Sequence, residues 1–252
     1  MTSRPSRRRP AATSHVDAGS FTAEEIAHAA LVVSIVGPIV GPLAAALPRT
    51  EVVLHRLTTL PNTIVAISGT LTGRTVGGPP TDLGLRTFAA GWREHLIGYR
   101  TEAADGRVMR SSSLFFHAPS GRPVACLCLN ADVNDLQRAR DVLALLTGTT
   151  PLDGLVTEHA ASNETFPVSV ETLAEGILRE AVSAVGVPVG LMKKAHKLAV
   201  VRDLEGRGFF TIRDSVELVA QRLDVSRFTI YNYLKELLGG AGEAQLPVGV
   251  GQ

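Results

Sequence analysis

Short runs of apolar residues alternate with turn-forming residues over the first half of the chain, a pattern typical of antiparallel strands. Two such runs precede a short amphipathic segment, and three more precede a longer one. Asp105-Gly106 and Ser120-Gly121 are hairpin signals, so the last three runs should form a meander. We expect strands at 51–57, 63–68, 95–102, 107–118 and 122–133, and helices at 81–92 and 133–147.

A further apolar helix should precede the first strand. Thr22 and Glu25 have the spacing of a capping box, and the helix meets Gly-Pro pairs near residue 37, where we expect it to end. The stretch 26–48 contains no charged residue and is long enough to cross a bilayer. Its three prolines, and the two glutamates before it, favour a buried or dimer-forming helix over a membrane span.

This order of elements predicts an α+β sensory module with a five-stranded antiparallel sheet and flanking helices. The longer helix, 133–147, should close the module with an apolar face formed by Val133, Leu136, Ala139, Leu143 and Leu146. Another amphipathic helix follows at 169–185, and the GVPVG segment at 186–190 breaks it. An all-α domain should begin near Leu191.

The most specific pattern is the segment 213–237, where two short amphipathic helices flank a three-residue turn. Asp214, with Glu217 three residues on, should cap the first helix, and Ser226 should cap the second. Asp224 falls at the turn position that needs a residue tolerant of left-handed geometry. The inward side chains should be Val216, Val219, Ala220, Leu223, Ile230, Leu234 and Leu237. This spacing matches a helix-turn-helix.

The outward face of the second helix suits a DNA groove, although a solvated helical hairpin would also carry polar residues there. Arginine pairs with guanine, asparagine pairs with adenine, and hydroxyl groups bind phosphates. Lysines on the preceding helix suit contacts to the DNA backbone. The predicted DNA-contacting residues are Ser226, Arg227, Thr229, Tyr231, Asn232, Lys235, Lys193 and Lys197.

A single helix-turn-helix reads one half-site, so we expect a homodimer or a higher homo-oligomer on double-stranded operator DNA. The apolar N-terminal helix and the helix at 169–185 are the candidate dimer elements.

Charge supports an anionic partner. The net charge is +1, yet Arg4, Arg7, Arg8 and Arg9 crowd the first sixteen residues, and the helix-turn-helix segment is also basic. We expect a disordered basic tail at 1–20, a sensor domain at 21–147, a linker and connecting helix at 148–190, a DNA-binding domain at 191–238 and a flexible tail at 239–252.

Nothing in the sequence predicts catalysis, a metal or a cofactor. Two cysteines, Cys126 and Cys128, are too few for a zinc site and are expected to be small buried residues. The histidines are scattered and form no recognisable catalytic pattern. The sequence has no convincing signal peptide, so we expect a cytoplasmic protein without a membrane partner.

The glycine-rich segment 69–80 offers the alternative of a metabolite- or nucleotide-handling enzyme. A phosphate loop requires G-x-x-x-x-G-K-[ST], whereas the spacing here is one residue short and Arg74 replaces the lysine. We therefore expect the glycines to permit positive φ in turns at the rim of the sheet. Arg74 should form an ion pair with Asp82 or bind an anionic ligand. The candidate effector-binding residues are Arg74, Ser112 and Asn130.

Taken together, the chain resembles the YheO-like PAS-domain regulators, which include the D-arginine-utilisation repressor (DauR) type. The resemblance rests on EVVLHRL, AISGTLTGRTVGGPPTDLGL, GRVMRSSSLFF and ACLCLNADV in the first half, and on KLAVVRDLEGRGFFTIRDSVELVAQRLDVSRFTIYNYLKEL near the C-terminus. It covers residues 21–238. It implies a PAS-like sensor and a helix-turn-helix that binds operator DNA, and it favours a repressor. Asp224 departs from a common glycine, and the arginine-rich head lies outside the pattern.

Overall fold

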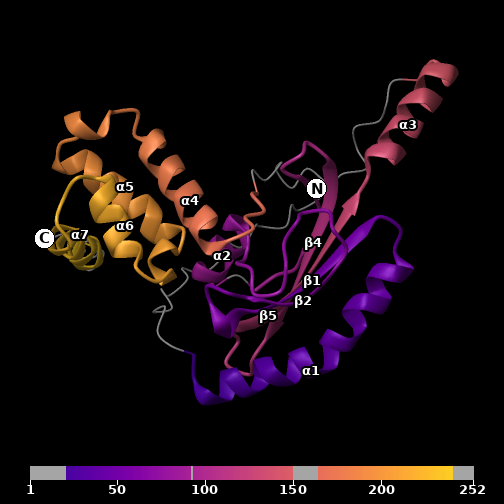
Figure 1. The fold of residues 1–252 in the computed structure, drawn as a ribbon, viewed down its shortest axis with the longest axis horizontal. Helices are drawn as coiled ribbons and strands as arrows, with labels where there is room; N and C mark the ends of the chain where they lie inside the picture. The colour runs from indigo at the N-terminus through magenta and orange to yellow at the C-terminus, as the bar shows by residue number, and fades with distance from the viewer. Residues whose placement is uncertain (1–20, 92, 150–163, 241–252) are drawn as a thin grey trace, which may run out of the picture.

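A computed structural model describes residues 21–91, 93–149 and 164–240. It contains a sheet part, residues 21–149, and a helical part, residues 164–240, which lie next to each other (Figure 1). The predicted α+β fold with an all-α C-terminal region is confirmed. The predicted basic tail, residues 150–163 of the predicted linker and residues 241–252 of the predicted C-terminal tail lie outside the described residues.

The sheet part is built on five antiparallel strands in the order β2-β1-β5-β4-β3. The strands are β1 Thr50–Arg56, β2 Ile64–Ser68, β3 Leu96–Glu102, β4 Val108–His117 and β5 Pro123–Asp132. The predicted meander is therefore present as β3-β4-β5. Because β1 lies inside the sheet, Val52, Val53 and Leu54 are all fully buried.

Helix α1, Ala23–Ala46, lies along one face of the sheet (Figure 1). The predicted capping box is present: Glu25 N–H donates to Thr22 Oγ1 at 3.2 Å, and Thr22 N–H donates to Glu25 Oε2 at 3.0 Å. The helix does not end near residue 37 as predicted but continues through Pro38 and Pro42. Its inner residues pack on β1, and this burial compensates for the backbone hydrogen bonds that the prolines remove.

The outer face of α1 remains apolar and exposed, with Ile26, Leu31, Ile35 and Ile39 on it. By length and composition α1 could cross a membrane, and a single helix of this kind is weak evidence for a span. The sheet covers the inner face of α1, because Val33, Val36 and Val40 pack with Val52 and Leu54 of β1.

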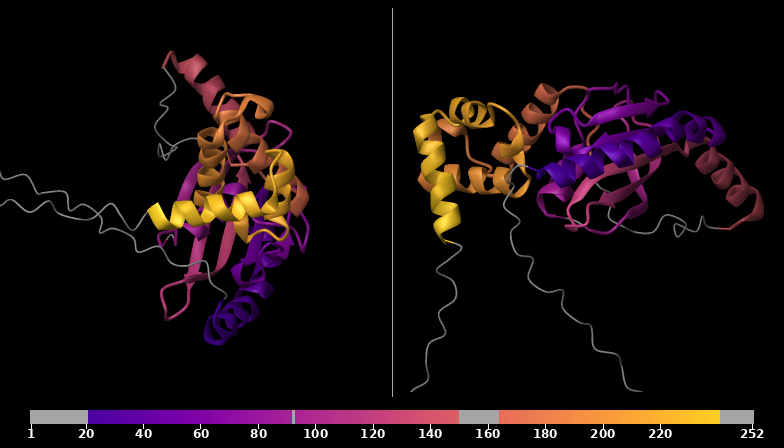
Figure 2. Two further views of the ribbon diagram at one scale, coloured as in Figure 1. Left: turned by 90° about the vertical axis from the view of Figure 1, so that its left-hand side faces the viewer. Right: turned by 90° about the horizontal axis from the view of Figure 1, so that it is seen from below.

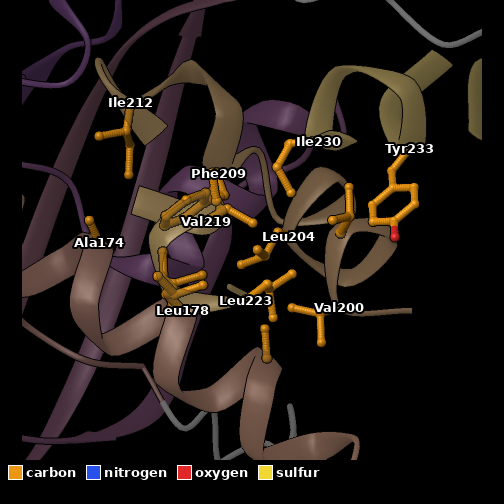
Figure 3. Close-up of a cluster of buried hydrophobic side chains, with 14 of the residues drawn as sticks. Ala174, Leu178, Val200, Leu204, Phe209, Ile212, Val219, Leu223, Ile230 and Tyr233 are labelled. Carbon is orange, nitrogen blue, oxygen red and sulfur yellow. The ribbon is translucent and has the colours of Figure 1, made fainter. Parts of the chain in front are cut away.

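The helical part folds around one hydrophobic core (Figure 3). It comprises α4 Val170–Ala184, α5 Lys194–Gly206, α6 Ser215–Arg222 and α7 Arg227–Gly240, with short 3-10 turns η3 Val189–Leu191 and η4 Phe209–Thr211. The apolar face of α4, including Leu173 and Ile177, is buried in this core. That face is therefore not available as a dimer element.

The two parts share packing through α2, Asp82–Ala89. Thr81 caps α2, because its hydroxyl accepts a hydrogen bond from Gly84 N–H at 2.9 Å. Leu85 of α2 is almost fully buried and belongs to the core of the helical part. The same segment thus links the sheet part to the core of the helical part.

Helix α3, Asn134–Thr147, projects away from the sheet (Figures 1 and 2). The prediction that it closes the sheet part with an apolar face is wrong. Among its residues, Ala144 is buried, whereas Leu136 and Leu143 are 71% and 61% exposed. The helix leaves the end of β5 in a direction that takes these side chains away from the sheet.

Candidate nucleic-acid interface and sensor interior

Helices α6 and α7 form the predicted two-helix unit around a tight turn. Val225 N–H donates to Ala220 O at 3.0 Å, and Asp224 takes the left-handed conformation with φ 50°. Ser226 caps α7, because its Oγ accepts from Thr229 N–H at 3.1 Å. Asp214 does not cap α6 as predicted: its own φ is 59°, and its side chain makes no capping bond.

The exposed stripe of α7 consists of Phe228, Tyr231, Asn232 and Lys235. These positions are spaced by three, one and three residues, so they share one face over two turns. Phe228 and Tyr231 are 72% and 59% exposed, a large aromatic area to leave in water. The opposite face is fixed in the core by Ile230 and Tyr233 (Figure 3).

Sequence reasoning missed both Phe228 on the outside and Tyr233 on the inside. The spacing contained the signal. Tyr233 follows Ile230 by three residues and so falls on its inward face, whereas Phe228 precedes Asn232 by four and falls on the outward face.

The other predicted DNA contacts surround the start of α7. Ser226 and Thr229 join their hydroxyls at 2.9 Å as part of the cap. Arg227 pairs with Glu217 of α6 at 3.1 Å, and both side chains are largely exposed. Such an exposed pair is weak, so the guanidinium is free to exchange its partner.

The two predicted lysines lie on or beside α5. Lys197 is half-buried, and its Nζ donates to Asp224 O in the turn at 3.4 Å. Lys193 is exposed at the start of α5. Lys197 therefore lies beside the start of α7. Lys193 lies four residues earlier, about one helical turn away at the start of α5.

The interior of the sheet part contains a hydrogen-bonded carboxylate, Glu51. It accepts from Thr72 N–H at 3.0 Å and from the Thr72 hydroxyl at 2.7 Å, and it pairs with Arg74 at 3.5 Å. The predicted pairing of Arg74 with Asp82 is therefore wrong. Gly69 makes this arrangement possible: its φ is 108°, and a Cβ there would lie 2.7 Å from Glu51 Cα.

Asn130 joins the same network, since its Nδ2 donates to Glu51 Oε1 at 3.3 Å. Ser112 does not, because alternate residues of β4 face opposite sides of the sheet. The inward hydroxyls are Ser111, bonded to Asn130 at 2.9 Å, and Ser113. Of the three candidate effector residues, the structure brings Arg74 and Asn130 together and leaves Ser112 apart.

A second buried carboxylate, Glu164, borders a cavity of about 20 Å³. One oxygen accepts from the Thr81 hydroxyl at 2.6 Å, and Oε2 has no hydrogen-bond partner among the described residues. Burial raises the pKa of Glu164 to about 7, while the Thr81 hydrogen bond opposes the rise. The cavity is also lined by His55, Ser113 and Cys128.

Glu164 begins a segment that we call the strap, residues 164–168. Thr165 N–H donates to Asp82 Oδ1 at 2.7 Å, and Phe166 lies beneath the Arg74 guanidinium at 5.1 Å. One residue after the strap, Ser169 caps α4. The cavity is therefore connected to the first helix of the helical part by a few residues of chain.

Comparison with known proteins assigns both parts. Residues 29–148 match the family described as the YheO-like PAS domain, and residues 173–235 match a family described as an HTH domain. The chain is 29% identical over 204 residues to a protein of Escherichia coli (strain K12) named "Uncharacterized protein YheO", covering 77% of this chain and 80% of that one.

Two further relatives are equally similar. An uncharacterized protein of Haemophilus influenzae is 29% identical over 191 residues, which cover 74% of this chain and 82% of the relative. The transcriptional regulator DauR of Pseudomonas aeruginosa is 29% identical over 195 residues, which cover 77% and 88%. No solved structure matches the chain.

Proposed function

Because the chain belongs to the YheO-like PAS-domain regulators with a helix-turn-helix, it is a DNA-binding transcriptional regulator, and we propose that it is a repressor controlled by a small molecule. The family also sets aside the alternative of an enzyme built on segment 69–80. We place the protein in the cytoplasm, where its DNA target lies.

The exposed stripe of α7 is the observation that carries the proposal of sequence-specific binding. We assign Asn232 to an adenine edge, Arg227 to a guanine edge and Phe228 to a thymine methyl group. The backbone N–H groups at the start of α7, next to Ser226, suit a phosphate oxygen. Lys193 and Lys197 add contacts to the DNA backbone that do not depend on sequence.

Operator recognition should be two-fold. A single α7 is long enough to read one half-site, and paired helix-turn-helix units read half-sites about 34–36 Å apart. Binding as a dimer would explain how so short a reading surface selects one site among many.

A gel-shift titration with the DNA upstream of the regulator's own coding region tests the base contacts assigned to Asn232 and Arg227. Asn232→Ala and Arg227→Ala should each weaken specific binding by roughly 1–3 kcal/mol and relax base preference at one position. Arg179→Ala, at an exposed arginine of α4, is the matched control and should bind normally. Unchanged operator affinity in both α7 variants would remove the assignment.

Lys193→Ala provides a different readout. Loss of a phosphate contact should weaken binding to all sequences and reduce the dependence of log K on log salt by about one. A change confined to base preference would show that Lys193 does not touch the DNA backbone.

The cavity beside Glu164 is our proposed effector site, and because its volume of about 20 Å³ holds about one water molecule, it must widen when a ligand binds. A buried carboxylate oxygen without a partner among the described residues favours a ligand that offers a hydrogen-bond donor. Arg74 Nη1 is likewise buried without a partner among those residues, although Arg74 does not line the cavity itself. Movement of Glu164 would be passed along the strap to α4, and through Thr81 to α2.

Native mass spectrometry of the purified full chain tests the effector proposal. A retained small molecule that is lost in Glu164→Gln supports it, and identical spectra from both proteins would contradict it. A reporter gene placed behind the operator then separates repression from activation. Higher expression without the regulator is expected of a repressor.

A further inference from the structure

The apolar surface of α3 is a feature that the proposed function leaves unexplained. Leu136, Leu143, Leu145 and Leu146 are 61–82% exposed on a helix of fourteen residues. Soluble monomers rarely leave such an apolar patch in water. A surface of this kind marks contact with another molecule.

The spacing on α3 identifies the kind of contact. Leu136, Ala139, Leu143 and Leu146 are separated by three, four and three residues, which is the a and d pattern of two heptads. Val142 and Leu145, which are 56% and 82% exposed, lie at positions g and c beside this a and d seam. The seam itself suits one partner helix. The seam is complementary to itself, because leucines of one copy fill the spaces between leucines of another.

The base of α3 is held firmly to the sheet. Arg49 pairs with Asp132 at 3.1 Å and with Asp135 on the first turn. Asn134 donates from Nδ2 to Val108 O at 3.2 Å, and its N–H donates to Asp132 at 3.0 Å. These bonds fix the direction in which the helix leaves the sheet, so the seam is presented in a defined orientation (Figures 1 and 2).

Charges beside the seam favour a parallel arrangement. With Leu136 at position a, Asp135 occupies position g and Arg140 the following position e. In a parallel pair, residue g of one helix faces residue e five positions later in the other, so the carboxylate and the guanidinium would meet twice. Arg140 now pairs with the exposed Asp141 at 2.9 Å, and Asp135 Oδ1 pairs with the exposed Arg138 at 3.5 Å, so both of these contacts are readily exchanged while Asp135 Oδ2 keeps Arg49.

We propose that α3 pairs in parallel with α3 of a second copy of this chain. This deepens the two-fold dimer of the proposed function and names its surface. A parallel pair lies along a two-fold axis, and so it arranges the two sheet parts symmetrically. The helix is only about 21 Å long, too short to pair as an isolated peptide, so the tests use the full chain.

Single cysteines placed along α3 report both contact and direction. Leu136→Cys and Leu146→Cys lie at opposite ends of the seam, and in a parallel pair each faces its own copy. Both variants should therefore form disulfide-linked dimers under mild oxidation. Asp141→Cys lies on the opposite side of the helix and, like the unsubstituted chain, should not.

The proposal would be overturned if neither Leu136→Cys nor Leu146→Cys formed a disulfide-linked dimer. Linkage that appears only when Leu136→Cys and Leu146→Cys are mixed would also overturn it, because that result shows an antiparallel pair.

Leu143→Glu supplies an independent test by size-exclusion chromatography with light scattering. The side chain is exposed within one chain, so the variant should keep a folded circular dichroism spectrum while its mass falls from dimer to monomer. A folded variant that remains dimeric would overturn the α3 surface. Specific DNA binding by that dimer would at the same time leave the proposed function intact.

Discussion

Glu51 and Glu164 are both buried carboxylates, yet they differ in what surrounds them. Glu51 is satisfied by Thr72, Asn130 and Arg74, so its charge is held by hydrogen bonds on several sides. Glu164 has one hydroxyl partner, lines the cavity and has a second oxygen without a hydrogen-bond partner among the described residues. The first carboxylate therefore serves the stability of the sheet part, and the second is suited to respond to a ligand.

Glu51→Ala should cost about 3–5 kcal/mol of unfolding free energy, because it leaves the Arg74 guanidinium buried without its charge partner. Urea unfolding followed by circular dichroism measures this. Asp105→Ala breaks an ion pair at the surface and should cause no measurable loss. A loss for Glu51→Ala as small as that of Asp105→Ala would mean that water replaces the carboxylate.

Glu164 should make stability fall as pH rises. Its folded pKa of about 7 lies above the ordinary 4.5, so between these values the folded chain keeps a proton that the unfolded chain releases. The contribution is complete below about pH 4.5 and is lost by pH 7, up to about 3 kcal/mol. Glu164→Gln should remove this part of the pH dependence, as urea midpoints at pH 5 and pH 8 would reveal. An identical slope in the variant would place the titration elsewhere.

Among the elements, those fixed by local signals were predicted well. The caps at Thr22 and Ser226 depend on a hydroxyl beside its own helix, and the structure contains both of them. Asp214 failed because its own backbone is left-handed. Glu51 was missed altogether, since its partners come from residues 72–74 and from Asn130, which are far from it in the sequence.

Predictions that required a packing partner fared less well. The apolar spacing of α3 is correct, but spacing alone does not say whether the face meets the sheet or another molecule. The end of α1 was misjudged for the same reason, because the sheet that supports the helix past Pro38 is assembled from later strands.

The turn between α6 and α7 provides a test at this scale. Asp224 has φ 50°, a conformation that costs non-glycine residues roughly 1–2 kcal/mol and asparagine or aspartate less. Asp224→Gly should therefore raise the unfolding free energy by up to about 1 kcal/mol. Operator affinity should stay unchanged, since Lys197 bonds the Asp224 carbonyl and not its side chain. A lower thermal midpoint in the variant would show that the aspartate side chain itself stabilises the turn.

At the scale of the whole molecule, the cavity and the DNA-reading helices are joined by two routes that meet at Thr81. Its hydroxyl accepts from Gly84 N–H to cap α2 and donates to Glu164 at the start of the strap. Through α2, Leu85 reaches the core of the helical part, and the strap leads to the cap of α4. A change at one hydrogen bond is thus positioned to alter both connections, as coupling between an effector site and a DNA site requires.

The contact between the two parts can be tested at Gly208, which precedes η4 and lies close to α2. Gly208 has φ 72°, and a Cβ there would lie 2.7 Å from the Ala89 Cβ. Gly208→Ala must therefore strain the backbone and push the helical part away from the sheet part. Because the two parts share one core around Leu85, we expect the unsubstituted chain to unfold in one calorimetric transition and this variant in two. Gly206→Ala is the matched control, since a Cβ there meets nothing within 4 Å, and it should keep the single transition. If Gly208→Ala also unfolds in one step at an unchanged temperature, the contact does not couple the two parts, and an effector signal would have to travel through the strap alone.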